Sequence, residues 1–258
     1  MLNLVRGFVF LSTVLLFWAC ASSIPPRRIG DYVPMDQYSE AESLLNVDTK
    51  PIQAGLVLVS DIAAPEAAPN LPDEALARLG NDLTREIGRV LPVTLKEVIS
   101  VKGTKLSAEN RAQVVDLAKQ HGLNHLAVVV LSSAEQEYPI TLFLGWTTHR
   151  QPGYRRENWS LLEFALLDVT AGKVLMREEG RGWATLDRPA VPGIDHWYPV
   201  VYRRSQDPDR RFWPPTYEGA PNMLRVVSFN QAAMRLTVKL QSTWRGRLEA
   251  DAAARRRG

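Results

Sequence analysis

Apolar and polar positions in the first half of the chain follow two alternating patterns. The runs at 54–60 and 126–131 are continuously apolar, which is typical of strands covered on both faces. Residues 72–91 place apolar side chains at intervals of three and four, so they predict an amphipathic helix. Residues 93–101 alternate between apolar and polar side chains, which predicts a further strand.

A second helix is predicted ahead of the strand at 126–131. Ser107 is a suitable N-terminal cap, the helix reaches Gln120 or His121, and Gly122 provides a C-terminal stop. The resulting order, β-α-β-α-β, is the pattern of parallel strands joined by helical crossovers.

The pattern changes in the middle of the chain. Residues 138–146 form an apolar, aromatic patch, and the polar segment at 147–156 is predicted as a loop. Residues 159–169 and 173–185 predict two long strands of a hairpin, joined by a tight turn that ends in glycine.

The C-terminal third combines a long loop with a long helix. Residues 186–217 contain too many prolines for a regular element, so we expect a loop insertion there. Residues 221–248 carry one apolar stripe and predict a helix. The predicted fold class is therefore α/β (α+β), a mixed sheet built from the β-α-β-α-β core and a long hairpin and packed by helices. We expect one domain over residues 51–250, followed by an arginine-rich tail at 251–258.

Composition narrows the class of protein. The chain has 258 residues, 45% of them hydrophobic, and a formal net charge of +3, which is ordinary for a folded globular protein. It contains one cysteine, so no disulfide can form within the chain. Charges of both signs are mixed along the sequence, and this gives no support for nucleic-acid binding, which needs a concentrated basic face.

The N-terminus has the layout of a secretory signal peptide over residues 1–19. Arg6 precedes an uncharged run rich in Phe, Leu and Val, and the small residue Ala19 ends it. Cys20 follows at once, and this arrangement resembles a bacterial lipobox, whose thiol is acylated before cleavage. The resemblance implies that the protein is held at a membrane through an N-terminal lipid on Cys20. In lipoproteins of this type, the residue after the lipidated cysteine often decides the destination. Here it is Ala21 and not aspartate, which by analogy points to the outer membrane and to a domain that faces the periplasm.

Residues 20–50 are predicted as the lipidated N-terminus and a flexible tether. A tether of about 30 residues has a typical end-to-end distance of about 30 Å, which keeps the folded part close to the membrane. The alternative is an uncleaved membrane helix at 7–24 in which Cys20 is incidental. Four polar residues interrupt that stretch, and a membrane span needs about 20 apolar residues.

Two segments carry a family resemblance. Residues 114–130, VVDLAKQHGLNHLAVVV, and residues 160–175, SLLEFALLDVTAGKVL, resemble a helix-turn-strand and a strand hairpin of a periplasmic α/β module. The module occurs in the curli-secretion lipoprotein family, in lipoprotein activators of penicillin-binding proteins, and at the amino terminus of the Tol-Pal-associated propeller protein. The resemblance implies a mixed sheet packed by helices, in proteins that act as scaffolds or regulators and not as catalysts.

Candidate chemistry is sparse. His121 and His125 are four residues apart, but Gly122 ends the helix between them and no third ligand has suitable spacing, so we expect no metal. Asp195 and His196 lack a recognisable nucleophile. No glycine-rich segment opens a helix after a strand, so we expect no phosphate-bearing cofactor and no enzymatic activity.

The long loop holds the candidate binding residues. It interleaves aromatic residues with arginines, a combination that is enriched at the hot spots of protein interfaces. Two interpretations stay open: a contact surface for a partner, or aromatic side chains that tuck the loop onto the sheet beneath solvated arginines. The candidate residues are Trp197, Tyr198, Tyr202, Arg203, Arg204, Arg210, Arg211, Phe212 and Trp213.

These observations favour a non-enzymatic, outer-membrane-anchored lipoprotein. We expect it to bind an unidentified envelope protein in envelope assembly, secretion or cell-wall maintenance. One alternative is a self-assembling secretion or pore component of the curli-secretion type, which would form a homo-oligomer. The other is an envelope hydrolase, which would need a nucleophile and a base that the sequence does not supply.

Overall fold

The computed structural model describes residues 25–41, 51–62, 67–102, 113–143, 150–190, 197–199 and 220–256. The helices and strands in chain order are α2 (Ile29–Tyr32), η1 (Met35–Gln37), β1 (Ser39–Glu40), β2 (Ile52–Asp61), α3 (Asp73–Val90), β3 (Val93–Lys102), α4 (Gln113–Gln120), β4 (His125–Phe143), β5 (Arg150–Asp168), β6 (Lys173–Pro189), β7 (Tyr198–Pro199) and α5 (Ala220–Arg255).

The strands of the described residues form one mixed sheet in the order β1-β6-β5-β4-β2-β3, and β7 pairs with β6. β2 pairs in parallel with both β3 and β4, as the predicted crossovers require. β4, β5 and β6 are antiparallel neighbours, so the predicted hairpin is confirmed. The predicted fold class, a mixed sheet packed by helices, is confirmed with it.

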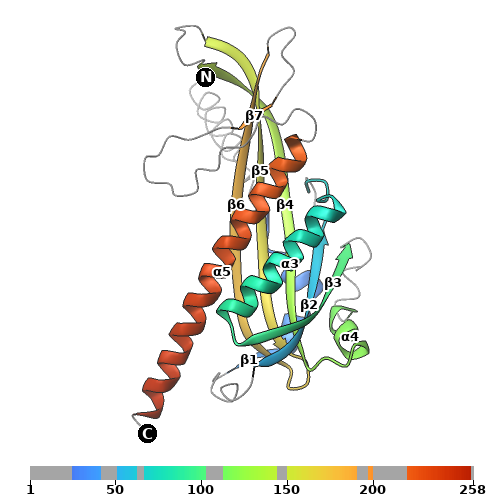
Figure 1. The fold of residues 1–258 in the computed structure, drawn as a ribbon, viewed down its shortest axis with the longest axis vertical. Helices are drawn as coiled ribbons and strands as arrows, with labels where there is room; N and C mark the ends of the chain where they lie inside the picture. The colour runs from blue at the N-terminus through green and yellow to red at the C-terminus, as the bar shows by residue number, and fades with distance from the viewer. Residues whose placement is uncertain are drawn as a thin grey trace, which may run out of the picture.

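The sheet is covered on both faces. α3 and α5 lie on one face, which we name the helix face (Figure 1). Its core joins side chains such as Leu83 of α3, Phe164 of β5 and Leu236 of α5. α4 and the segment at 25–41 cover the other face, which we name the N-terminal face, where Ala118 and Tyr32 are buried. Alternation along the strands separates the two cores, because successive side chains of a strand point to opposite faces.

The two long helices follow from their apolar stripes. α3 buries Leu79, Leu83 and Ile87 and ends just before Pro92, which is close to the prediction of 72–91. α5 is longer than the prediction of 221–248, and its C-terminal end projects beyond the sheet (Figure 1).

Two glycines of β6 allow α5 to lie directly on the strand backbone. A Cβ atom on Gly182 would overlap the carbonyl oxygen of Ser228 and lie 2.8 Å from the backbone nitrogen of Ala232. A Cβ atom on Gly180 would overlap the carbonyl oxygen of Ala232 and lie 2.6 Å from the backbone nitrogen of Leu236. The sequence pattern indicates only ordinary strand or turn glycines at these positions, and the structure gives both a packing role.

The strands of the hairpin are longer than predicted. β4 continues from the predicted run at 126–131 to Phe143, and β5 begins at Arg150. The loop prediction for 147–156 is therefore wrong from Arg150 onward, and the predicted insertion at 186–217 begins later, since β6 reaches Pro189. Charged side chains made these segments resemble loops, but they pair across the strands, as Arg156 does with Glu137.

The predicted tether at 20–50 does not extend through residues 25–41, which pack on the N-terminal face. Ile29, Tyr32 and Val33 are buried there, and β1 pairs in parallel with the start of β6. Three apolar side chains within five residues are too few to give a clear sequence signal, but they are enough to dock a short segment on an apolar sheet.

Candidate interaction surface

Three strands continue past the core of the sheet. β2 ends at Asp61, which pairs with Ser132 of β4, and beyond this point β4, β5 and β6 extend together. We name residues 133–143, 150–160 and 182–189 the arm, which rises above α3 and β3 in Figure 1. On the helix face the base of the arm is covered by the N-terminal part of α5, where Ala184, Leu186 and Leu224 form a small apolar cluster.

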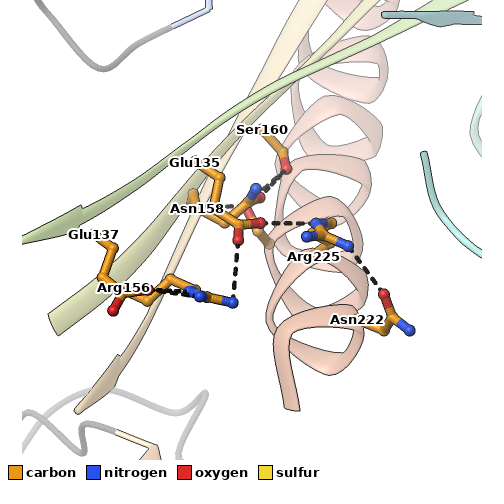
Figure 2. A network of polar contacts seen from close by, with 8 residues as sticks. Glu135, Glu137, Arg156, Asn158, Ser160, Asn222 and Arg225 are labelled. Atoms are coloured by element: carbon orange, nitrogen blue, oxygen red, sulfur yellow. Dashed lines mark hydrogen bonds and ion pairs between the residues drawn. The ribbon is translucent and has the colours of Figure 1, made fainter. Parts of the chain in front are cut away.

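A network of polar side chains joins the arm to α5 (Figure 2). The Glu135 carboxylate accepts a hydrogen bond from Nε of Arg225 at 2.7 Å and lies 3.6 Å from the Arg156 guanidinium. Arg156 donates through Nε to Glu137 at 3.0 Å. The Arg225 side chain is 8% exposed and that of Glu135 14% exposed, so this pair is largely removed from water. Such a pair is costly to break, because removing either partner leaves a buried charge without its counterion.

Smaller polar groups complete the network. The Ser228 hydroxyl of α5 donates to Oγ of Ser160 at 2.8 Å, and Oγ of Ser160 donates to Oδ1 of Asn158 at 3.0 Å. All three residues are buried. Asn222, in the first turn of α5, accepts a hydrogen bond from Arg225 at 2.9 Å. These bonds fix the position of α5 over the root of the arm.

Trp197 lies on this network between two guanidinium groups. Cζ of Arg156 is 4.9 Å from the centre of the Trp197 ring and Cζ of Arg188 is 5.0 Å from it. Arg188 also lies 5.2 Å from the ring of Tyr154, a residue that is 39% exposed. Each such cation–π contact contributes about 0.5–1 kcal/mol at an exposed site. The result is a row of alternating arginine and aromatic side chains that runs from the buried Arg225 to the exposed Tyr154.

The structure describes two of the predicted loop residues. Trp197 is half-buried on the arm, where it packs against the cluster of Ala184, Leu186 and Leu224. The backbone of Tyr198 pairs with Asp187, within the short strand β7. The other predicted site residues lie outside the described residues: Cys20, Tyr202, Arg203, Arg204, Arg210, Arg211, Phe212 and Trp213.

Sequence reasoning missed the residues that surround Trp197. Tyr154 and Arg156 fall within the segment predicted as a polar loop, and Arg188 falls within the predicted insertion. The local sequence gives no strand signal here, because residues 154–158 and 135–137 are almost entirely polar and do not alternate between apolar and polar side chains. The cross-strand pairs that neutralise these charges connect residues far apart in the chain, so a local pattern does not reveal them.

The opposite face of the arm carries a second set of pairs. The Trp159 and Trp183 rings lie directly across β5 and β6, with centroids 5.6 Å apart. Arg155 forms a bidentate pair with Asp187 at 2.7 and 2.9 Å. Burial, and then a hydrogen bond with Glu157, raise the pKa of Tyr138. The arm is therefore held by side-chain contacts on both faces and is not only a backbone ladder.

Below the arm, two buried carboxylates hold the segment at 25–41. Asp61 accepts hydrogen bonds from the Tyr32 hydroxyl at 2.7 Å and from Nε of Arg28 at 3.0 Å. Glu163 accepts hydrogen bonds from the backbone N–H groups of Arg28 and Ile29. Burial raises the pKa of Glu163, although the two N–H donors oppose the shift. Burial, and then the hydrogen bond to Asp61, raise the pKa of the Tyr32 hydroxyl.

Two further kinds of site, a metal centre and a membrane-spanning helix, bear on the class of protein. No group of three or more His, Cys, Asp or Glu side chains among the described residues is arranged to hold a metal ion. The two histidines meet different partners, since Nδ1 of His121 lies 3.0 Å from Glu97 and Nε2 of His125 lies 3.7 Å from Asp168. Within the same described ranges, none of the helices combines the length and the apolar character needed to span a bilayer.

Comparison with known proteins gives distant structural matches only. No family model matches the sequence, and no curated protein matches it. Among solved structures, a neuraminyllactose-binding hemagglutinin homolog from Helicobacter pylori is 8% identical, with a TM-score of 0.34 over 79% of this chain and 90% of that chain. Lipoprotein GNA1162 from Neisseria meningitidis is 10% identical, with a TM-score of 0.26 over 54% of this chain and 85% of that chain.

A third match is a PelC dodecamer from Paraburkholderia phytofirmans, at 15% identity and a TM-score of 0.24, covering 71% of this chain and 92% of that chain. The solved neighbours thus include a bacterial lipoprotein. With TM-scores below 0.5, none of these matches assigns a function. The resemblance to the three lipoprotein families stays a prediction from the sequence.

Proposed function

We propose that this protein is a lipid-anchored, non-enzymatic binding protein of the bacterial envelope, with Cys20 acylated in the outer membrane and the folded part in the periplasm. The support is the leader-like segment at 1–19 and the cysteine that follows it. Pro25, the first described residue, comes only five positions after Cys20. At about 3.4 Å per residue this stretch spans at most about 17 Å, so the anchor holds the N-terminal face of the sheet close to the bilayer.

The observation that supports binding most directly is the arginine–aromatic row on the arm. Its buried end is fixed by the pair of Glu135 and Arg225, and its outer end presents Arg188 and the partly exposed ring of Tyr154. Rigid aromatic and arginine side chains lose little conformational freedom on binding, and they are enriched at interface hot spots. The proposed partner is a protein of envelope assembly, secretion or cell-wall maintenance that contacts this end of the row.

Photocrosslinking in the cell tests this proposal. A benzophenone amino acid at Tyr154 should capture a partner, whereas the same group at Val238 should not, although Val238 is 62% exposed on α5. The captured protein, identified by mass spectrometry, distinguishes an envelope partner from a second copy of the chain, which would favour the self-assembling alternative. Equal capture at both positions, or capture at neither, would contradict the assignment of the arm.

The anchor has its own test. Mass spectrometry of the mature protein should find acyl chains on Cys20 as the N-terminal residue, and C20S should leave the membrane fraction. An intact, unacylated leader would contradict the proposed anchor while leaving the binding role of the arm open to the crosslinking result.

A further inference from the structure

Along part of its length, the outer edge of β6 has no strand partner among the described residues. At its start Lys173 and Val174 pair with β1, and near its end Leu186 and Asp187 pair with β7. Between these two short partners, no other described strand pairs with the side of β6 that faces away from β5. β6 is accordingly the outermost long strand on the left of the sheet in Figure 1.

The pairing of β6 with β5 fixes which backbone groups face outward. The N–H of Ala190 donates to the carbonyl of Pro152 on β5, and the register runs without a shift from there to Met176, so the even-numbered residues from Met176 to Arg188 form the hydrogen-bonded pairs with β5. The odd-numbered residues then direct their N–H and C=O groups away from the sheet. The N–H of Trp183 confirms the alternation, since it donates outward to Oε1 of Gln231 at 2.8 Å.

Side chains of α5 satisfy several of these outward groups. Arg235 donates to the carbonyl of Arg181 at 2.9 Å, and Arg247 donates to the carbonyl of Leu175 at 2.6 Å. Such contacts blunt an exposed edge and prevent unspecific strand pairing. Arg177 and Glu179 lie between the blunted positions, and the described residues supply no partner for their outward N–H and C=O groups.

A cavity of about 430 Å³ adjoins these two residues. Arg247 of α5 and Glu178 bound it on the helix face, and Arg27 and Glu179 bound it on the N-terminal face. The cavity therefore surrounds the sheet edge from both sides. We name it the edge slot, defined by these four residues and Arg177.

Charges of both signs line the edge slot, and among the described residues Arg177 and Glu178 have no ion pair, although Glu178 accepts a hydrogen bond from Thr243 of α5. Glu179 is paired with Arg27 at 2.7 Å and with Arg181 at 3.0 Å. Burial alone would raise the pKa of Glu179, but the hydrogen bonds from Arg181 and Arg27 lower it, so this carboxylate stays ionised. Arg247 lies 3.7 Å from Glu40. Arg177 is exposed and has no ion pair with any described residue.

We propose that the edge slot binds an extended peptide segment that adds to β6 as a short strand and carries a carboxylate opposite Arg177. An extended chain fits because Arg177 and Glu179 repeat their outward N–H and C=O groups every two residues, about 6.6 Å apart, which is the repeat of a strand. A carboxylate fits because it neutralises the unpaired guanidinium through a charge-assisted hydrogen bond. This site is separate from the arginine–aromatic row and does not depend on the proposed anchor.

Fluorescence anisotropy with two labelled, end-blocked pentapeptides tests the proposal, one of sequence Val-Glu-Val-Glu-Val and the other Val-Lys-Val-Lys-Val. The glutamate peptide should bind the protein about tenfold more tightly, as one charge-assisted contact implies. R177A should abolish this preference, and R177E should reverse it. R85A, which removes an exposed arginine of α3, is the matched control and should change nothing.

R177P tests the strand contact separately from the charge. Proline removes the outward N–H and no bond to β5, so the fold should persist while affinity falls about tenfold. If R177P fails to fold, amide hydrogen exchange on the unmodified protein decides, because bound peptide should protect the N–H groups of Arg177 and Glu179. Absence of binding at about 1 mM peptide, or binding without protection of these amides, would overturn the proposal.

Discussion

Replacing Gly182 by alanine is expected to destabilise the protein by about 1–3 kcal/mol. The added methyl group would overlap the carbonyl oxygen of Ser228 and approach the backbone nitrogen of Ala232 to 2.8 Å. Both obstacles are helix backbone, which cannot rotate away as a side chain can, so α5 must lift from β6. The general gain from replacing glycine, about 0.4–1 kcal/mol through the unfolded chain, is too small to offset this cost.

Urea denaturation of purified protein measures the effect, and the midpoint of thermal unfolding should fall by about 2–4 °C for each kcal/mol. G246A is the matched control, because a Cβ at that position of α5 meets nothing within 4 Å. It should stabilise the protein by up to about 1 kcal/mol, the usual advantage of alanine over glycine within a helix. A G182A protein as stable as the unsubstituted one would refute the close approach of α5 to β6.

Three further predictions concern polar contacts. E163A leaves two buried backbone N–H groups without an acceptor and should cost about 1–3 kcal/mol, whereas E163Q keeps an acceptor. The pKa of Glu163 is raised in the folded protein, so its contribution to stability is full below the ordinary glutamate pKa and is lost as pH rises through the raised pKa. The urea midpoint of the unsubstituted protein should therefore fall with rising pH relative to the midpoint of E163Q. E135A should lower the free energy of unfolding by about 3–5 kcal/mol, because Arg225 is left buried without its carboxylate partner. Replacing both Glu135 and Arg225 by methionine should destabilise the protein less than replacing either one of them by methionine. W197A should speed proteolytic cleavage next to residues 197–199 and W197F should not, because phenylalanine keeps a ring between Arg156 and Arg188.

Each of these has an outcome that would contradict it. A constant difference between E163Q and the unsubstituted protein across pH would mean that Glu163 is not desolvated in the folded state. Additive effects in the cycle of Glu135 and Arg225 would show that the two side chains do not interact. Equal digestion of the W197A and W197F proteins would show that the ring does not hold residues 197–199 on the arm.

The parts of the fold with one consistent period could be predicted from the sequence. α3 carries a single apolar stripe, and the strands at the centre of the sheet are continuously apolar because both their faces are buried. Local sequence is sufficient in these cases, since one face or both faces of the element meet the core along its length.

The arm and the docked N-terminal segment could not be predicted in the same way. Arg155 and Arg156 point to opposite faces of β5, and each is neutralised by a different neighbouring strand, so a polar stretch is fully structured. Trp197 stood out by composition alone. Its partners Arg156 and Arg188 come from distant positions, and only the strand register brings them to one place.

The register of β4 and β5 also has a mechanical consequence. Their pairing runs without a shift from His125 and Asp168 to Phe143 and Arg150, whereas β5 and β6 slip by one residue at Leu166 and Leu167, deep in the sheet. The backbone ladder between β4 and β5 therefore continues without interruption from the centre of the sheet into the arm. A force applied at the outer end of the arm would be transmitted as shear along this uninterrupted ladder of backbone hydrogen bonds to the centre of the sheet.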